Sequence, residues 1–422
     1  MGKIKKLLLL LAIIFCFACE ETTNADNVSN QKEENETLIA EKTQEKIIRA
    51  YNNNIVVGAE ILDKYLPILQ GKSIGILANH SSLVKNQHLV DTLLALNQNV
   101  IKVFCPEHGF RGTADAGTHI GDYVDEATNL PVISLYGNKK KPSIADLKGI
   151  EIMIFDVQDV GVRFYTYISS LHYLMEACAE NNIPLIVLDR PNPNGFYVDG
   201  PVLDMKYKSF VGMHPVPVVH GMTIAEYAQM INEEKWLKNQ VKAELHLVKM
   251  KNYQHNDLYQ LRVNPSPNLK TMNAIYLYPS LCFFEGTTVS AGRGTENPFE
   301  KYGHPEMKNK SFTFTPKSME GATEPKFKNQ VCYGENLIGK GDEFAVSENP
   351  YLDFSYLIDA YQNIENKNNF FGKFLEKLTG NSEIRKMIEA GESAENIRAS
   401  WTEEVEAFKQ KRKKYRLYKD FE

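Results

Sequence analysis

A short glycine-rich stretch places an acid, an imidazole and a guanidinium directly after an apolar run. Residues 104–112 read FCPEHGFRG and follow the β-branched run VIKV. Glu107 follows a proline, which favours extended backbone, and precedes glycines, which let backbone approach a ligand. Glutamate is not a preferred turn residue, and an apolar crevice favours its protonated form, as a general acid requires. We therefore predict that Glu107 is catalytic. His108 either orients it or is an ordinary loop residue.

A pair of aspartates and an arginine lie in the segment FDVQDVGVRF, residues 155–164. Asp156 and Asp159 flank the dipeptide VQ, and Arg163 follows four residues later. Paired carboxylates beside an arginine occur in hydrolytic sites, but they also form structural ion pairs. Both interpretations stay open, so we keep the two aspartates as catalytic candidates and Arg163 as a candidate ligand-binding residue.

A third group of charged residues lies in the glycine-rich segment CFFEGTTVSAGRGTENPF, residues 282–299. The segment contains Glu285, Arg293 and Glu296. Because Arg293 stands between two glycines, its guanidinium has room to form a paired contact with a carboxylate ligand. We predict that Glu285 is catalytic and that Arg293 and Glu296 bind the ligand.

The elements that must position these residues follow an alternating pattern. Six short apolar runs are candidate buried strands: 73–78, 100–104, 131–136, 151–157, 184–189 and 244–250. Helical patterns at 88–96, 169–180 and 223–234 alternate with them. Such a βαβ series predicts an α/β fold with an open, doubly wound, mostly parallel sheet and helices on both faces.

Polar residues come just after several of the predicted strands. Asn79 and His80 follow the first strand, Glu107 follows the second, and Asp156 lies at the end of the fourth. Doubly wound sheets bind ligands outside the carboxyl ends of their strands, where loops and helix N-termini converge. The sequence therefore predicts one cleft at this edge of the sheet, with Asn79 and His80 among its binding residues.

Two other acids are assigned a structural role. Glu226 and Asp146 stand three residues after Thr223 and Ser143, which is the spacing of a capping box. Each acid is expected to bond back to the N-terminus of its own helix. We therefore do not count them as site residues.

The composition changes after about residue 264. Segments such as NPSPN and FTFTPKSMEGATEPKF are rich in turn residues and aromatics, with short strand-like pieces between them. We predict a catalytic domain over residues 51–265 and a second, smaller mixed α/β domain over 266–422 that completes the cleft. The closing helix has Trp401, Val405 and Phe408 on one stripe, and its basic run KQKRKK is either a solvated end or a contact for anionic cell-surface polymer.

The first fifty residues predict export and anchoring. Three lysines precede an apolar run from residue 7 to 18, which is short for a membrane span and suits a secretory signal. The stretch FACEE places a small residue before Cys19 and resembles the cleavage box of bacterial lipoproteins. We expect a signal peptide over 1–19, lipidation of Cys19 and a flexible tether over 20–50. The protein would then be anchored in the cell envelope, in the outer membrane and facing the periplasm or the cell surface.

Composition excludes several other classes. With 422 residues, 43% hydrophobic and 24% charged, the chain can form two folded domains. A formal net charge of -5 offers no broad basic surface, so no nucleic-acid partner is expected. Cys105, Cys178, Cys282 and Cys332 have apolar neighbours and are expected to be buried thiols. The sequence lacks a zinc-type cysteine spacing, and no cofactor or metal is expected.

Several motifs together resemble those of a known family. They are PEHGFRG, FDVQDVGVRFYTYISSL, VLDRPNPNGFYVDGP, HGMT and YPSLCFFEGTTVSAGRGTENPF, and the likeness extends from about residue 71 to the end of the sequence. In this order they resemble the exo-β-N-acetylmuramidase (NamZ-like) family. The resemblance implies a Rossmann-like domain joined to a smaller one, a glycosidase that removes N-acetylmuramic acid from the non-reducing end of peptidoglycan fragments, and catalysis by Glu107. The loop NHSSL departs from the NPTG-like stretch of many relatives, so His80 and Ser81 are not carried over.

The chemistry is compatible with this family, and three rivals remain. Glycoside hydrolysis uses one or two carboxylates, and the lactyl carboxylate of muramic acid needs a cation, for which Arg293, Arg163 and Arg111 are candidates. A non-catalytic cell-wall-binding lipoprotein is one rival, and a nucleotide-binding protein, which lacks its glycine motif here, is another. A metal-dependent hydrolase is the third, and its ligands would come from His80, His108, Asp115, His119, Asp156 and Asp159.

Overall fold

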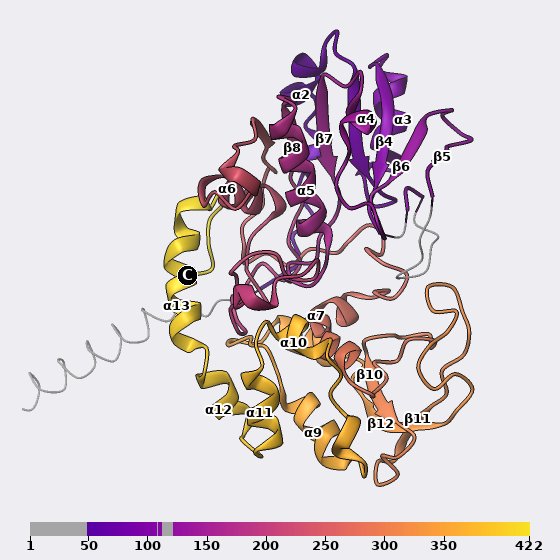
Figure 1. Cartoon of the computed structure of the whole chain (residues 1–422), viewed down its shortest axis with the longest axis vertical. Coiled ribbons are helices and arrows are strands. Elements are labelled where there is room, and N and C mark those ends of the chain that lie inside the picture. Colours follow the sequence, from indigo (N-terminus) through magenta and orange to yellow (C-terminus); the bar gives the residue numbers. More distant parts are fainter. Residues whose placement is uncertain (1–48, 108, 112–120) are drawn as a thin grey trace, which may run out of the picture. The chain divides into compact units, whose positions relative to one another are not determined.

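Seven strands form the main sheet, in the order β5-β6-β4-β1-β7-β8-β9. Their bounds are β1 Ile74–Ala78, β4 Val100–Cys105, β5 Tyr123–Val124, β6 Pro131–Ser134, β7 Ile152–Asp156, β8 Leu185–Leu188 and β9 Leu245–Val248. Every neighbouring pair is parallel except β5 and β6. The six predicted strands and the doubly wound, mostly parallel sheet are confirmed in this computed structural model (Figure 1). It describes residues 49–107, 109–111 and 121–422.

Helices alternate with these strands and continue beyond them. The α-helices are α2 Leu62–Leu69, α3 Leu89–Ala95, α4 Ile144–Leu147, α5 Tyr167–Glu180, α6 Ile224–Glu233, α7 Met272–Leu281, α8 Lys340–Ala345, α9 Ser355–Asn363, α10 Leu375–Thr379, α11 Glu383–Glu389, α12 Ala394–Ala399 and α13 Thr402–Arg412. Short 3₁₀ helices are η1 Gly58–Glu60, η2 Met205–Tyr207, η3 Lys238–Gln240, η4 Cys282–Gly286, η5 Lys367–Asn369 and η6 Lys413–Tyr415. Among the described residues, no helix has the length and apolarity of a membrane span.

The central strands are buried on both faces, as their nearly continuous apolar sequence requires. All residues of β1 and β7 are buried. Gly75 lets side chains pack directly on β1, because a Cβ there would lie 2.4 Å from the sulfur of Met153 and 2.7 Å from Cδ1 of Ile150, so both would have to shift. The two strands therefore form a tightly packed core from which the loops at their carboxyl ends extend.

The C-terminal part of the chain contains a second, smaller sheet. It has three strands in the order β10-β12-β11, with bounds β10 Lys301–His304, β11 Phe312–Phe314 and β12 Cys332–Asn336, and both pairs are antiparallel. A short hairpin, whose strands β2 Leu83–Val84 and β3 Gln87–His88 have two residues each, belongs to neither sheet. All ten residues of α7 are buried, so this helix is a core element. The predicted domain division at residues 265 and 266 stays a prediction.

Both predicted capping boxes are present. Thr223 and Glu226 bond reciprocally at the start of α6, and Ser143 and Asp146 do so at the start of α4. The structural role assigned to the two acids is therefore confirmed. The four cysteines of the described chain are buried free thiols, as expected.

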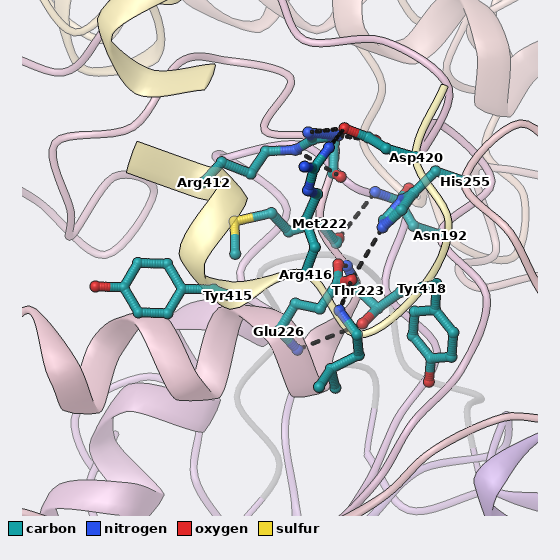
Figure 2. Close-up of polar contacts among 12 residues, drawn as sticks. Asn192, Met222, Thr223, Glu226, His255, Arg412, Tyr415, Arg416, Tyr418 and Asp420 are labelled. Carbon is teal, nitrogen blue, oxygen red and sulfur yellow. Dashed lines mark hydrogen bonds and ion pairs between the residues drawn. The ribbon is translucent and has the colours of Figure 1, made fainter. Parts of the chain in front are cut away.

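The final helical region differs from the single helix expected. It is broken between α12 and α13, and Trp401, Val405 and Phe408 are buried as predicted. Arg412, within the basic run, is fully buried and pairs with Asp420 at 2.6 Å (Figure 2). The expectation that this run is a solvated helix end is therefore wrong for Arg412, whose charge is neutralised inside the fold.

Candidate active site

The loop after β4 presents Glu107 at the carboxyl edge of the sheet. The amide of Gly109 donates to the carbonyl of Pro106 at 3.1 Å, and Gly109 has a φ of 77°, which closes a tight turn around the glutamate. Phe110 is fully buried, and its ring meets the edge of His88 at 4.8 Å. This contact anchors the loop while Glu107 stays partly exposed. His108 lies outside the described residues.

Glu107 lines a cavity of about 560 Å³ that residues from both parts of the chain enclose. Its other main lining side chains are Tyr136, Phe164, Thr166, Phe210, Val211, Tyr278, Cys282, Glu285, Arg293, Thr323, Glu324, Lys326 and Phe374. A smaller space of about 70 Å³ shares Glu107, Thr166 and Arg293 with it. We call the two spaces together the Glu107 cleft. The predicted cleft at the carboxyl ends of the strands thus contains Glu107, Glu285 and Arg293.

Two features of the sheet half lie near the Glu107 carboxyl. Burial raises the pKa of Tyr136, and the charge of Glu107 and the hydrogen bond between the two side chains raise it further. Thr166, the N-cap of the fourteen-residue helix α5, lines both spaces of the cleft. A helix N-terminus favours negative charge nearby. Tyr136 therefore orients the glutamate through a hydrogen bond, and the N-terminus of α5 adds positive potential to the cleft.

On the C-terminal side of the cleft, Glu285 forms an ion pair with Arg293. The Nε of Arg293 donates to Oε1 of Glu285 at 3.0 Å. Burial by itself raises the pKa of Glu285, but the charges of Arg293 and Lys326 outweigh burial and lower it. Glu285 is therefore an ionised carboxylate at neutral pH. This charge state differs from that of a general acid, which must carry a proton.

An aromatic wall joins the two sides. Tyr278 packs edge-on against Phe164 at 5.5 Å and against Phe299 at 5.0 Å. The guanidinium of Arg293 lies over the Phe299 ring at 5.1 Å. Aromatic side chains offer apolar faces to sugar rings while their hydroxyl groups stay polar. The wall thus gives the cleft the mixed surface that a carbohydrate ligand needs.

Asp156 does not lie in this cleft, which corrects the prediction that it is catalytic. The carboxylate is fully buried and accepts two hydrogen bonds from Arg190, at 2.6 and 2.8 Å. In β7 it faces the interior, and both oxygens contact the same guanidinium. Of the two interpretations left open by the sequence, the structural ion pair is the one that the structure supports.

Asp159 and Arg163 are also interior residues, and their predicted catalytic and binding roles are corrected. Asp159 accepts from the amide of Gly161 at 2.6 Å, and burial raises its pKa to about 7. Arg163 is fully buried and donates to three backbone carbonyls at 2.7 to 2.8 Å, those of Pro201, Val216 and Leu378. A guanidinium used in this way holds loops together and cannot reach a ligand.

The polar side chains of the loop after β1 also bond to other residues of the fold. Asn79 is fully buried, donates to the hydroxyl of Tyr167 at 2.9 Å and accepts from Ser81. Its predicted binding role is therefore corrected to a loop-stabilising one. His80 contacts the carbonyl of Asn264 at 2.7 Å and lines a separate cavity of about 270 Å³. The structure does not bring it to the Glu107 cleft.

Arg111 and Glu296 were both predicted to bind the ligand, but neither lines the Glu107 cleft. Arg111 forms a two-point contact with Asp125 at 3.1 and 2.8 Å, and its guanidinium lies over Phe110 at 4.4 Å. Glu296 is exposed on the turn that follows Arg293. Arg111 is a candidate because of its charge and Glu296 because of its glycine-rich segment, and neither property fixes where the side chain lies in the fold.

Sequence reasoning missed several lining residues, notably Tyr136, Thr166, Phe210 and Lys326. Thr166 lies two residues after the segment 155–164, which contains predicted site residues, so its position in the sequence could have indicated it. Lys326 stands in the turn-rich stretch GATEPKF, where a lone lysine gives no signal. Phe210 lies on a loop, and the sequence does not indicate that this loop passes beside the cleft.

The cleft carries no metal-binding signature in the part of the chain that the structure describes. No group of three or more histidine, cysteine or acidic side chains there could hold a metal ion. Two of the ligands considered for a metal-dependent hydrolase, Asp156 and Asp159, are engaged as described above. Asp115 and His119 lie outside the described residues.

Both parts of the chain match models of one family. Residues 74–273 match the N-terminal model, and residues 276–418 the C-terminal model, of the exo-β-N-acetylmuramidase NamZ. A peptidoglycan β-N-acetylmuramidase NamZ from Bacillus subtilis (strain 168) is 40% identical over 380 residues, which cover 85% of this chain and 90% of that protein. The chain belongs to the exo-β-N-acetylmuramidase NamZ family. The resemblance found in the sequence is thereby confirmed.

Two solved structures are similar to this chain over most of its length. A DUF1343 family protein from Bacteroides fragilis NCTC 9343 is 49% identical with a TM-score of 0.81, over 87% of this chain and 100% of that one. A second DUF1343 family protein from the same organism is 28% identical with a TM-score of 0.72, over the same shares. The α/β fold of this chain is therefore shared with two DUF1343 family proteins of known structure.

Proposed function

We propose that the protein is an exo-acting glycosidase that releases N-acetylmuramic acid from the non-reducing end of peptidoglycan fragments. One observation carries this proposal: Glu107 lies in a cleft with aromatic walls, and the same cleft contains the ionised Glu285–Arg293 pair. The Bacillus subtilis relative, named a peptidoglycan β-N-acetylmuramidase, supports the substrate class.

The proposed chemistry needs a proton donor and, for most glycosidases, a second carboxylate. Glu107 would protonate the glycosidic oxygen, aided by its position at the sheet edge and beside Tyr136. The carboxylates that line the main space in the described chain are Glu107, Glu285 and Glu324. Glu324 is exposed and pairs with Lys328 at 2.7 Å, which leaves Glu285 as the second carboxylate. Its low pKa suits a base that activates water, since the carboxylate of Glu285 stays ionised at neutral pH.

Substitution of the proposed acid tests this mechanism. Glu107→Gln should retain the fold and lower turnover of a muramic-acid-terminated disaccharide by about 100-fold or more, because the proton donor is lost. The release of free sugar from the non-reducing end is measured by chromatography. Glu296→Gln is the matched control, because this glutamate is exposed outside the cleft, and it should leave turnover unchanged. Turnover near the wild-type value in Glu107→Gln would move the chemistry to another residue.

The same product assay separates the enzyme from a binding protein. A non-catalytic cell-wall-binding lipoprotein would bind the disaccharide and release no sugar. A metal-dependent hydrolase would lose turnover after chelation and regain it with one metal ion. We expect release of N-acetylmuramic acid that chelation does not change.

We further propose that the protein is exported and anchored by lipid on Cys19. The lysines, the apolar run and the FACEE stretch support this proposal, and an anchor in the cell envelope would hold the enzyme near its polymer substrate. Cys19 itself lies outside the described residues. Metabolic labelling with a fatty-acid analogue should mark the wild-type protein but not Cys19→Ala. Equal labelling of the two would refute the assignment.

A further inference from the structure

The Glu107 cleft contains a positively charged site with room for one additional anion. We propose that Arg293, held in place by Glu285 and Lys326, binds the lactyl carboxylate of the terminal sugar and so selects N-acetylmuramic acid over N-acetylglucosamine. This inference rests on the proposed function and assigns the sugar specificity of the same site. In this view Arg293 is the binding residue, and Lys326 is a positioning residue.

The backbone around Arg293 is built to present a guanidinium. Gly292 and Gly294 have φ values of 77° and 79°, a region that residues with a side chain rarely adopt. A Cβ on Gly294 would lie 2.5 Å from the ring of Pro325 and 2.6 Å from the carbonyl of Lys317. The turn can therefore pack this closely only with glycine on both sides of the arginine. Arg293 itself lines both spaces of the cleft.

Arg293 keeps its ligand-binding atoms available. Its Nε is the atom that donates to Glu285, at 3.0 Å, and the ring of Phe299 supports the guanidinium plane. No described residue accepts a hydrogen bond from its two terminal nitrogens. The side chain is 26% exposed. Two terminal nitrogens in one plane match the two oxygens of a carboxylate, which is the strongest geometry for such a pair.

Lys326 contributes charge without competing for the ligand. Its ammonium donates to the carbonyls of Phe284, Thr287 and Val289, at 2.8, 2.7 and 3.1 Å. An ammonium has three hydrogens, so all its donors are used. Burial lowers the pKa of Lys326, and the charge of Glu285 opposes this effect. The lysine is thus a fixed positive charge that holds the 284–289 segment beside Arg293.

The immediate surroundings of Glu285 carry one positive charge in excess. Arg293 and Lys326 carry two positive charges, whereas Glu285 supplies one negative charge between them. A partly desolvated site with an excess positive charge attracts an anionic ligand more strongly than water does. Of the three arginines considered from the sequence, only Arg293 can serve, because Arg163 and Arg111 are engaged elsewhere.

Two substrates that differ only in the lactyl group test the proposal. We would measure hydrolysis of an aryl β-N-acetylmuraminide and of the matching aryl β-N-acetylglucosaminide by the wild type and by Arg293→Ala. The variant should lose about 10- to 100-fold in kcat/KM on the muraminide, mainly through KM, as expected for one charge-assisted contact. Because Arg293 also keeps Glu285 ionised, both substrates should share any loss in kcat. Only the muraminide carries the lactyl group, so only the muraminide should show the additional rise in KM.

A matched control and a chemical rescue make the result decisive. Arg385→Ala removes an arginine with the same kind of contact, Nε to Oε1 of Glu389 at 2.9 Å, on the exposed helix α11. It should leave both substrates unaffected. Added guanidinium ion should restore part of the muraminide activity of Arg293→Ala, which a purely structural role would not allow. An equal loss on both substrates, or no rescue, would overturn the assignment of Arg293.

This outcome is separable from failure of the proposed function. If the wild type releases no sugar from the muraminide, the glycosidase proposal fails. The carboxylate site is then tested by calorimetry, which measures the dissociation constants of free N-acetylmuramic acid and of free N-acetylglucosamine. Tighter binding of the acid by the wild type, lost in Arg293→Ala, supports the site. Equal affinity for the two sugars refutes it.

Discussion

At the scale of single residues, two carboxylate–arginine pairs show how burial separates structure from chemistry. Asp156 is fully buried with both oxygens on Arg190, whereas Glu285 is 28% exposed with one oxygen on Arg293. A buried pair holds strands together, because neither charge can reach solvent or ligand. The half-buried Glu285–Arg293 pair leaves donor and acceptor atoms facing the cleft. Residue type and spacing did not distinguish these two cases.

The buried pair predicts a loss of stability on substitution. Asp156→Asn leaves Arg190 as an uncompensated charge, so we expect the free energy of unfolding to fall by about 3–5 kcal/mol. Chemical denaturation followed by circular dichroism measures it. The exposed Arg385–Glu389 pair is the control, and Arg385→Ala should change stability by less than about 1 kcal/mol. Similar effects of the two substitutions would contradict the structural reading of Asp156.

Asp159 predicts a pH dependence of stability. Burial raises its pKa from 3.8 to about 7, so between these values the folded protein keeps a proton that the unfolded chain has lost. Its contribution to stability is present below about pH 4 and is lost as pH rises through about 7, by at most about 4 kcal/mol. Asp159→Asn cannot titrate, so the stability of this variant relative to wild type should rise between about pH 4.5 and about pH 7.5. Unfolding curves at the two pH values measure the difference in free energy of unfolding between the variant and the wild type. The same difference at both pH values would refute the prediction.

At the scale of elements, the Gly-Arg-Gly turn of residues 292–294 leaves little room for an added side chain. Gly294→Ala adds a Cβ against Pro325 in addition to the strain of a positive φ, so we expect a loss of about 2–4 kcal/mol in stability and a raised KM for muraminides. Gly391→Ala is the control, since its φ of 82° is similar but no described atom lies within 4 Å of the added Cβ. It should lose only about 1–2 kcal/mol with KM unchanged. Equal effects on KM would show that the turn does not position Arg293.

At the scale of the whole molecule, the C-terminal segment ties distant parts of the chain to the sheet. The amide of Leu417 donates to Glu226 at 2.7 Å, and His255 contacts the same oxygen at 3.0 Å, in the cluster that Figure 2 shows. Tyr418 donates to Asp189 at 2.5 Å and accepts from the amide of Met250 at 2.9 Å. These contacts join the start of α6, the residue after β8 and the last residues of the chain into one polar core.

Removal of one hydroxyl measures this coupling. Tyr418→Phe leaves the buried amide of Met250 without its acceptor and removes one of the two donors to Oδ2 of Asp189, which keeps the hydroxyl of Thr223. We therefore expect the free energy of unfolding to fall by about 1–3 kcal/mol. Tyr361→Phe is the control, because its ring packs on Phe371 and its hydroxyl bonds to no described residue. It should change stability by less than about 0.5 kcal/mol. Activity per folded molecule should be unchanged in both, since neither residue lines the cleft.

The sequence by itself determined the parallel sheet, the capping boxes and the choice of Glu107, because these depend on local periodicity, local hydrogen bonds and the residue types in one loop. It also determined the family, through motifs in a fixed order. Only the tertiary structure decided which charged residues share a cleft. Asp156 and Arg163 looked as suitable as Glu285 and Arg293, and the difference is burial and the identity of partners far along the chain. Such contacts are set by packing, which one sequence without its fold does not reveal.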